Sequence, residues 1–219
     1  LPHKNIKTLC GKPLIAWSIE KALKSKFLDR IILSTDSREY EEIGLAFGAE
    51  SPFLRPAILS SDTASTFDVV EHLLEHYRKS INEEFDYIVL LEPTSPLRED
   101  NDIDNMLEQL DQKRIDFDAI TSLGEVHEHP SIFRKINKDH KVSMTFSNLK
   151  LTSRRQDNEP VYFPYGVAYI IKRETLFDQR TFFPKRTTYY KINRYQCFEV
   201  DDIYDFLTIE NVMRYEWKI

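Results

Sequence analysis

The chain has little of what marks several large classes of protein. Its only two cysteines, Cys10 and Cys197, lie far apart and without metal-ligand spacing. This favours a reducing cytosol over a disulfide framework. No apolar run approaches the roughly 18 residues of a membrane span, and no signal peptide is visible. The net charge of −6 indicates no basic footprint for nucleic acid. We therefore expect a cytoplasmic protein that binds neither membrane nor nucleic acid.

Strand-like and helix-like segments alternate along the 219 residues. This alternation predicts a single α/β domain spanning 1–219, with a mostly parallel sheet and helices on both faces. Strands are expected at 30–34, 87–91, 119–123 and 166–171. Helices are expected to begin near Leu14, at Asp36 or Ser37, after Ser65 and near Asp202.

The segment 127–164 breaks this alternation. It is polar and carries short alternating apolar runs, such as Ile132, Phe133 and Ile136 followed by Val142, Met144 and Phe146. Alternation with period two is typical of half-buried strands. We therefore expect an inserted β-rich arm here rather than another strand–helix unit.

The segment 90–98, Leu-Leu-Glu-Pro-Thr-Ser-Pro-Leu-Arg, ends a buried strand abruptly. Open α/β sheets bind ligands beyond the carboxyl ends of their strands. There Thr94, Ser95 and Arg98 can donate hydrogen bonds to an anionic ligand. The alternative is a rigid corner that binds nothing.

Taken together, several short motifs resemble the acylneuraminate cytidylyltransferases, also called CMP-sialic acid synthetases. The resemblance extends from Leu1 to about Asn211 and implies a nucleotide-diphospho-sugar transferase-like fold, with the arm exchanged between the subunits of a homodimer. It also implies a strand and a triphosphate-binding loop before Leu1, both missing from this sequence. The motifs, in order, are Leu1-Pro2-His3-Lys4-Asn5, Gly11-Lys12-Pro13-Leu14-Ile15, Ser34-Thr35-Asp36, Leu54-Arg55-Pro56, Ser61-Asp62-Thr63, Pro93 to Arg98 and Arg154-Arg155-Gln156.

The resemblance assigns a first group of residues to the nucleotide. Lys4 and Asn5 precede the first helix, where cations and backbone amides suit a phosphate; the alternative is a solvated basic turn. The other residues of this group, on the loop expected to read the cytosine and ribose, are Arg55, Ser61, Asp62 and Thr63.

Glu199-Val200-Asp201 supplies a carboxylate pair. Alternate residues of a strand point to the same side, so both acids can face one Mg²⁺ together with substrate phosphates. The family usually has Asp-x-Asp here, which makes Asp201 the safer ligand and Glu199 its support. We expect Lys4 and Asp201 to be catalytic.

A last group is expected at the sugar acid. Glu92 and Tyr165 depart from the Gln and Asn that the family often has, so the sugar acid is left open. Arg155 and Gln156 match the family's Arg-Gln segment on the arm, where a guanidinium can bind a carboxylate; a surface charge run is the alternative.

These residues predict transfer of CMP from CTP to a sialic-acid-like nonulosonic acid, with release of pyrophosphate. The nearest alternative is the same reaction on Kdo, legionaminic or pseudaminic acid. Two further alternatives are a metal-dependent glycosyltransferase and a non-catalytic nucleotide-binding protein. The late position of Glu199-Val200-Asp201 disfavours the glycosyltransferase, whose acidic triplet normally follows a mid-chain strand.

Overall fold

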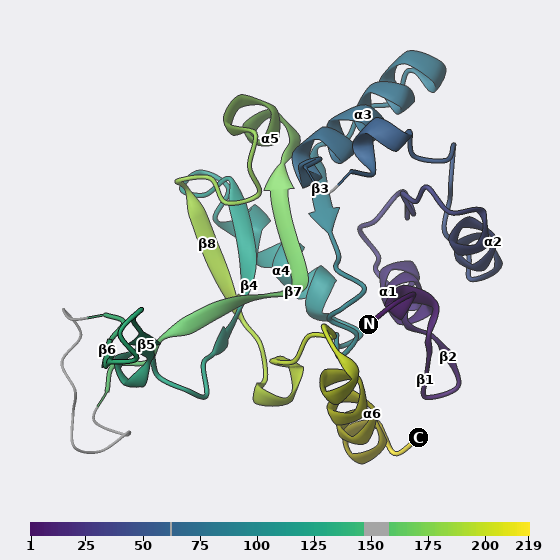
Figure 1. Ribbon diagram of the computed structural model, residues 1–219. Helices are drawn as coiled ribbons and strands as arrows, with labels where there is room; N and C mark the ends of the chain where they lie inside the picture. Colours follow the sequence, from purple (N-terminus) through teal and green to yellow (C-terminus); the bar gives the residue numbers. More distant parts are fainter. Residues whose placement is uncertain (62, 147–157) are drawn as a thin grey trace.

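The computed structural model describes residues 1–61, 63–146 and 158–219, and it centres on a four-stranded sheet (Figure 1). The strand order is β3-β7-β4-β8. β4 and β8 are parallel, but β7 runs antiparallel to both β3 and β4. The sheet is therefore mixed, which corrects the expectation of a mostly parallel one. The strands are β3 (Tyr87–Leu90), β4 (Ala119–Glu125), β7 (Tyr162–Lys172) and β8 (Thr187–Lys191).

The connection between β4 and β7 explains the reversed strand. The chain leaves β4 at Glu125 and re-enters the sheet at Tyr162, which pairs with Glu125. Because the chain returns at the same end of the sheet, β7 must run antiparallel to β4; a parallel neighbour would need a crossover to the opposite end. The apolar run 166–171 fits either direction.

Helices cover both faces of the sheet, as expected. Alternate residues of β4 and β7 point to opposite sides. On one face, Ala119 and Ile171 pack with residues from α3 (Thr66–Ile81) and α5 (Arg173–Gln179). On the other, Ile120 and Ile170 pack with residues from α4 (Asp102–Gln112). In the described part of the chain, every helix is too short or too polar to traverse a bilayer.

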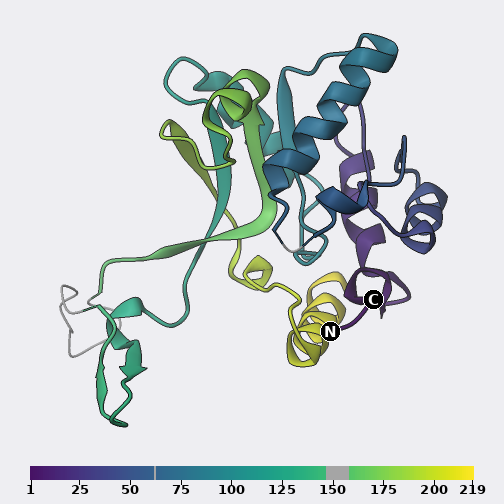
Figure 2. The same cartoon turned by 45° about the horizontal axis from the view of Figure 1, so that its top comes forward.

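The first and last segments of the chain pack together beside the sheet. A small hairpin of β1 (Thr8–Leu9) and β2 (Lys12–Pro13) leads into α1 (Leu14–Leu23). The buried cluster formed by Trp17 of α1 with Phe206 and Ile209 joins it to α6 (Ile203–Trp217). Figures 1 and 2 show these two helices side by side. This packing brings segments near residues 4 and 200 to one place.

Local capping explains where three helices begin. The Ser37 hydroxyl accepts a hydrogen bond from the amide of Tyr40 at the start of α2 (Arg38–Ala46). α3 and α6 begin with capping boxes, Ser65 with Asp68 and Asp202 with Asp205, which satisfy amides that a helix leaves unpaired. The expected strand at 30–34 is reduced to a single parallel bridge, Ile32 with Glu50. The Glu50 amide donates to the Ile31 carbonyl, and the Glu50 carbonyl accepts from the Leu33 amide.

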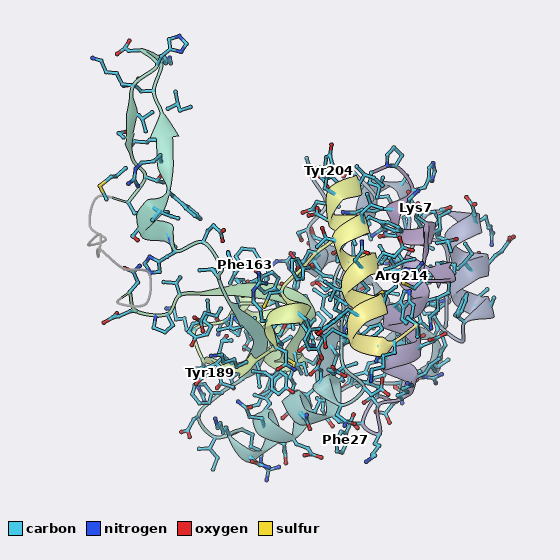
Figure 3. All side chains as sticks on the ribbon, turned by 90° about the horizontal axis from the view of Figure 1, so that it is seen from below. Lys7, Phe27, Phe163, Tyr189, Tyr204 and Arg214 are labelled. Atoms are coloured by element: carbon cyan, nitrogen blue, oxygen red, sulfur yellow. The ribbon has the colours of Figure 1, made fainter. Side chains whose placement is uncertain are left out.

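The arm stands out from the body, and its described part is a hairpin of β5 (Arg134–Ile136) and β6 (Val142–Met144) (Figure 1). Its β character is as predicted. Ile136 and Val142 are 73% and 65% exposed. Figure 3 shows Phe163 where the arm joins the body.

The described residues also form short 3₁₀ helices. They are η1 (Lys4–Ile6), η2 (Ala57–Leu59), η3 (Pro130–Ile132) and η5 (Arg194–Gln196).

Candidate functional site

The structure brings the two expected catalytic residues together. Lys4 Nζ donates to the Val200 carbonyl at 2.7 Å and pairs with Asp201 Oδ1 at 3.1 Å. Val200 is fully buried, and its amide donates to the Thr94 carbonyl at 2.8 Å. This bond docks the 199–201 segment against the loop that follows β3. The Asp201 side chain remains 83% exposed, so its carboxylate is open to a ligand.

Glu199 has different surroundings from Asp201. Its Oε1 accepts hydrogen bonds from the Ser95 hydroxyl at 2.9 Å and from the Gly166 amide at 2.7 Å. The expectation that a strand carries both acids is wrong, because the 199–201 segment is not one of the strands in the described part of the chain. The two acids have separate partners, and a cation shared between them stays a prediction. Among the described residues, no three His, Cys, Asp or Glu side chains gather as a metal cluster.

Glu92 lies beside Glu199 at the end of β3. Burial, and then the charge of Glu199, raise the pKa of the Glu92 carboxyl. A Cβ at residue 166 would come within 2.4 Å of Glu92 Oε2, so Gly166 leaves the space that this side chain occupies. Gly166 is a site residue that the sequence analysis did not single out. Its only signal in the sequence was its place directly after Tyr165.

Arg98 does not face a ligand, contrary to the sequence-based expectation. Its side chain has no exposed surface. The guanidinium donates to the backbone carbonyls of Glu92, Gly166 and Val167 and to the hydroxyl of Ser18. Desolvation lowers the pKa of Arg98 to about 10, so it stays charged at neutral pH. A fully buried guanidinium that donates to protein oxygens cannot contact a substrate.

The two hydroxyl residues of the same motif also have structural contacts. Ser95 is 1% exposed, and its hydroxyl donates to Glu199 rather than to a ligand. Thr94 contributes its carbonyl to Val200, and its side chain is half-buried. Thr94 is therefore the only hydroxyl of this pair that the structure leaves near the surface.

Tyr165 is half-buried at the start of the body portion of β7. Its ring packs edge-on against Phe163, with ring centroids 5.0 Å apart. Gly124 allows the Tyr165 ring to approach β4, because a Cβ at Gly124 would lie 2.8 Å from it. Burial raises the pKa of the Tyr165 hydroxyl. Tyr165 thus precedes Gly166 in β7, and its side chain packs with Val167 and Cys197.

A second group of predicted residues gathers around Arg55. The Arg55 amide donates to the Thr35 carbonyl at 2.7 Å, and its Nε donates to Ser60 Oγ at 3.2 Å. Its Nη2 lies 3.7 Å from Asp36 Oδ1. The motifs 34–36 and 54–56 therefore meet, as ligand-edge segments should. Arg55 still keeps part of its side chain exposed.

The remaining nucleotide residues are placed as follows. The hydroxyls of Ser61 and Thr63 are 3.1 Å apart and exposed. Asn5 Oδ1 is buried and has no hydrogen-bond partner among the described residues. Tyr40 OH lies 3.3 Å from His3 Nδ1, a contact between η1 and α2 that no sequence signal indicated. Asp62, Arg155 and Gln156 lie outside the described residues.

Lys12 does not join Lys4. Its ammonium group pairs with Glu20 and lies 3.7 Å from the centroid of the Trp17 ring. Lys7 is likewise placed against α6, with its ammonium 5.5 Å from the Phe206 ring, on the side of α6 seen in Figure 3. Lys4 is therefore the lysine of this segment that reaches Asp201.

Comparison with known proteins defines first the fold and then the class of protein. The chain aligns with a solved structure of CMP:2-keto-3-deoxy-manno-octonic acid synthetase complexed with CTP at a TM-score of 0.67 and 18% identity, over 99% of this chain and 93% of that one. This likeness establishes the fold. A model of the cytidylyltransferase family matches residues 1–215, and the chain belongs to this family.

Curated relatives within this family differ in the sugar acid they are named for. The chain is 34% identical over its whole length to an N-acylneuraminate cytidylyltransferase of Streptococcus agalactiae serotype V, of which it covers 51%. It is 31% identical over 94% of its length to a pseudaminic acid cytidylyltransferase of Campylobacter jejuni, of which it covers 87%. The chain thus spans about half the length of the first of these relatives.

Proposed function

We propose that the chain transfers CMP from CTP to the anomeric hydroxyl of a nonulosonic sugar acid. The anomeric oxygen forms a bond to the α-phosphorus, the bond from that phosphorus to the bridging oxygen breaks, and pyrophosphate leaves; the hydroxyl proton passes to water. Besides family membership, one observation carries the proposal. Lys4 and the exposed carboxylate of Asp201 meet from opposite ends of the chain at 3.1 Å.

Asp201 is the residue we assign to Mg²⁺. Magnesium keeps several waters and is typically held by one or two carboxylates together with substrate phosphates. A carboxylate that is 83% exposed and touched by one ammonium group fits this requirement. When bound, Mg²⁺ neutralises charge on the phosphates. Lys4 supplies a second positive charge for the same oxygens, because its ammonium group is already at Asp201.

We assign the cytosine nucleotide to the Arg55 group. The Arg55 group consists of Arg55, Ser61 and Thr63, which present a guanidinium and short hydroxyls. Asp62, which follows Ser61 in the sequence, is assigned to the nucleotide with them. Asn5 joins them on the strength of its buried Oδ1, because buried acceptors without a partner are rare in proteins.

We assign the sugar acid to the end of β3 and the start of β7. Glu92, Thr94 and Tyr165 are the described residues for this role, and Arg155 and Gln156 are the proposed carboxylate ligands from the arm. Glu92 places an acceptor beside the substrate, which suits a hydroxyl or amide N–H of the sugar. The relatives bear names from both N-acylneuraminic and pseudaminic acid, so a panel of acids is needed.

We further propose a homodimer that forms through the arm and works in the cytoplasm. The arm exposes apolar side chains that a partner would cover, notably Ile136 and Val142. Large exposed apolar patches typically mark interaction sites.

The test is pyrophosphate release from CTP with a panel of sugar acids: N-acetylneuraminic acid, legionaminic acid, pseudaminic acid and Kdo. ATP and GTP serve as alternative nucleotides. We expect release with CTP and one of the nonulosonic acids. Release with Kdo alone would identify the nearest alternative. Binding of CTP without any release would favour a non-catalytic protein, and transfer from a nucleotide-sugar donor would indicate a glycosyltransferase.

A further inference from the structure

Both the amide and the carbonyl of Gly166 form hydrogen bonds within the candidate site. Its amide and the Ser95 hydroxyl both donate to Glu199 Oε1, at 2.7 and 2.9 Å. Its carbonyl accepts from Arg98 Nη2 at 2.9 Å and from the Glu92 amide at 3.2 Å. We call Ser95, Arg98, Gly166 and Glu199 the Gly166 clamp. It joins the loop after β3, the strand β7 and the segment before α6.

The Gly166 clamp determines where two sugar-acid residues lie. The Glu92 carboxylate fills the space that a side chain at residue 166 would take. Tyr165 is the covalent neighbour of Gly166, so a shift of the Gly166 amide moves Tyr165 as well. We therefore expect a change that releases Gly166 from Glu199 to displace Glu92 and Tyr165. The side-chain contacts of Arg55, with Ser60 and Asp36, involve neither Gly166 nor Glu199.

We propose that Glu199 is a positioning residue that acts through Gly166, and not a ligand of Mg²⁺. A metal ligand must turn a charged oxygen toward the cation. Glu199 is half-buried, and two hydrogen bonds to Oε1 fix its carboxylate against Ser95 and Gly166. Its neighbour Asp201 offers the exposed carboxylate. The assignment of Glu199 to the sugar-acid end rests on the proposed cytidylyltransferase function.

Two substitutions separate charge from reach at this position. Glu199→Gln keeps the length and an acceptor oxygen but removes the charge. Glu199→Asp keeps the charge but is one methylene shorter, so its oxygens fall short of Ser95 and Gly166. A positioning residue requires the reach, whereas a metal ligand requires the charge as well. Only the positioning role therefore predicts that Glu199→Gln is more active than Glu199→Asp.

The measurement is steady-state pyrophosphate release with CTP, sugar acid and Mg²⁺ varied in turn, together with thermal unfolding. We expect Glu199→Gln to exceed Glu199→Asp in kcat/KM for the sugar acid by about tenfold, because the shorter side chain loses both hydrogen bonds and the neutral amide oxygen can keep them. The KM for CTP and the Mg²⁺ requirement should not separate the two variants. Glu199→Gln should also unfold at the higher temperature. Glu108→Gln and Glu108→Asp, on the exposed side of α4, are the matched controls.

The reverse order of activity, with a higher Mg²⁺ requirement in Glu199→Gln, would overturn the inference. A parent protein that releases no pyrophosphate refutes the proposed function instead, and the order of unfolding temperatures still tests the clamp. If neither variant folds, Ser95→Ala removes one of the two donors to the same oxygen. It should raise the KM for the sugar acid but not the Mg²⁺ requirement, and a parent-like KM would refute the positioning role.

Discussion

Replacement of Arg98 by methionine tests whether this residue is structural or faces a ligand. Methionine has a similar length and stays apolar, so it fills much of the same space but donates no hydrogen bond. In the parent, Arg98 has no exposed surface and donates to three backbone carbonyls and the Ser18 hydroxyl. The substitution therefore removes the buried charge and all of these bonds together.

The expected loss of stability depends on which acceptors of the Arg98 hydrogen bonds still have a second donor. The Glu92 carbonyl retains the Ser95 amide at 3.1 Å, and the Gly166 carbonyl retains the Glu92 amide at 3.2 Å. If about two charge-assisted hydrogen bonds go uncompensated, at roughly 1.5 kcal/mol each, Arg98→Met loses about 3 kcal/mol. For a chain of this size each kcal/mol lowers Tm by about 2–4 °C, which gives a fall of roughly 6–12 °C.

The assay is thermal and urea unfolding of Arg98→Met beside the parent at neutral pH. Arg114→Met is the control, because Arg114 is 67% exposed and pairs only with the exposed Asp111; a surface change of this kind stays within about 0.5 kcal/mol. The reasoning fails if Arg98→Met unfolds within about 2 °C of the parent while its KM for the sugar acid rises. That result would return Arg98 to the ligand-binding role that its motif indicates.

Three further predictions concern the metal, the pH dependence and the assembly. Asp201→Asn keeps the shape but removes the charge assigned to Mg²⁺, so turnover should fall by about 10²–10³ with little change in Tm; near-parent turnover in a Mg²⁺ titration would place the metal elsewhere. The raised pKa of Glu92 means that its carboxyl stabilises the fold below its usual value of 4.5, and that this contribution is lost as the pH rises through the folded-state pKa. Glu92→Gln should therefore raise Tm relative to the parent more at about pH 8 than at about pH 4. Equal Tm differences at both pH values would argue against a carboxyl that is buried beside another negative charge. Light scattering at micromolar concentration should give the mass of a dimer; an active monomer would exclude a site shared between subunits.

The sequence alone determined the features that depend on local chemistry. Ser65 with Asp68 and the start near Asp202 located helix starts because a cap needs only residues within one turn. The buried residues of the last helix, Phe206, Ile209 and Met213, recur every three to four positions, a period that the sequence itself displays. The ordered motifs between Leu1 and Asn211 also identified the family, because they require only residue types and their order along the chain.

The tertiary structure decided the features that depend on partners distant in sequence. An apolar run fits a strand of either direction, so only the return of the chain at Tyr162 beside Glu125 made β7 antiparallel. The motif around Arg98 marks a strand end in either case, but burial of its guanidinium depends on β7 and α1. The family pattern made Asp201 the safer metal ligand, but no local signal indicated that Glu199 bonds to Ser95 and Gly166.

The physical reason is that a side chain's role is set by the groups around it. Glu199 and Asp201 are two residues apart and carry the same charge. Gly166 and Ser95 occupy the oxygen of one, and Lys4 approaches the other at 3.1 Å. Those partners lie 33 to 197 positions away, and only packing of the two chain ends against the sheet brings them within reach.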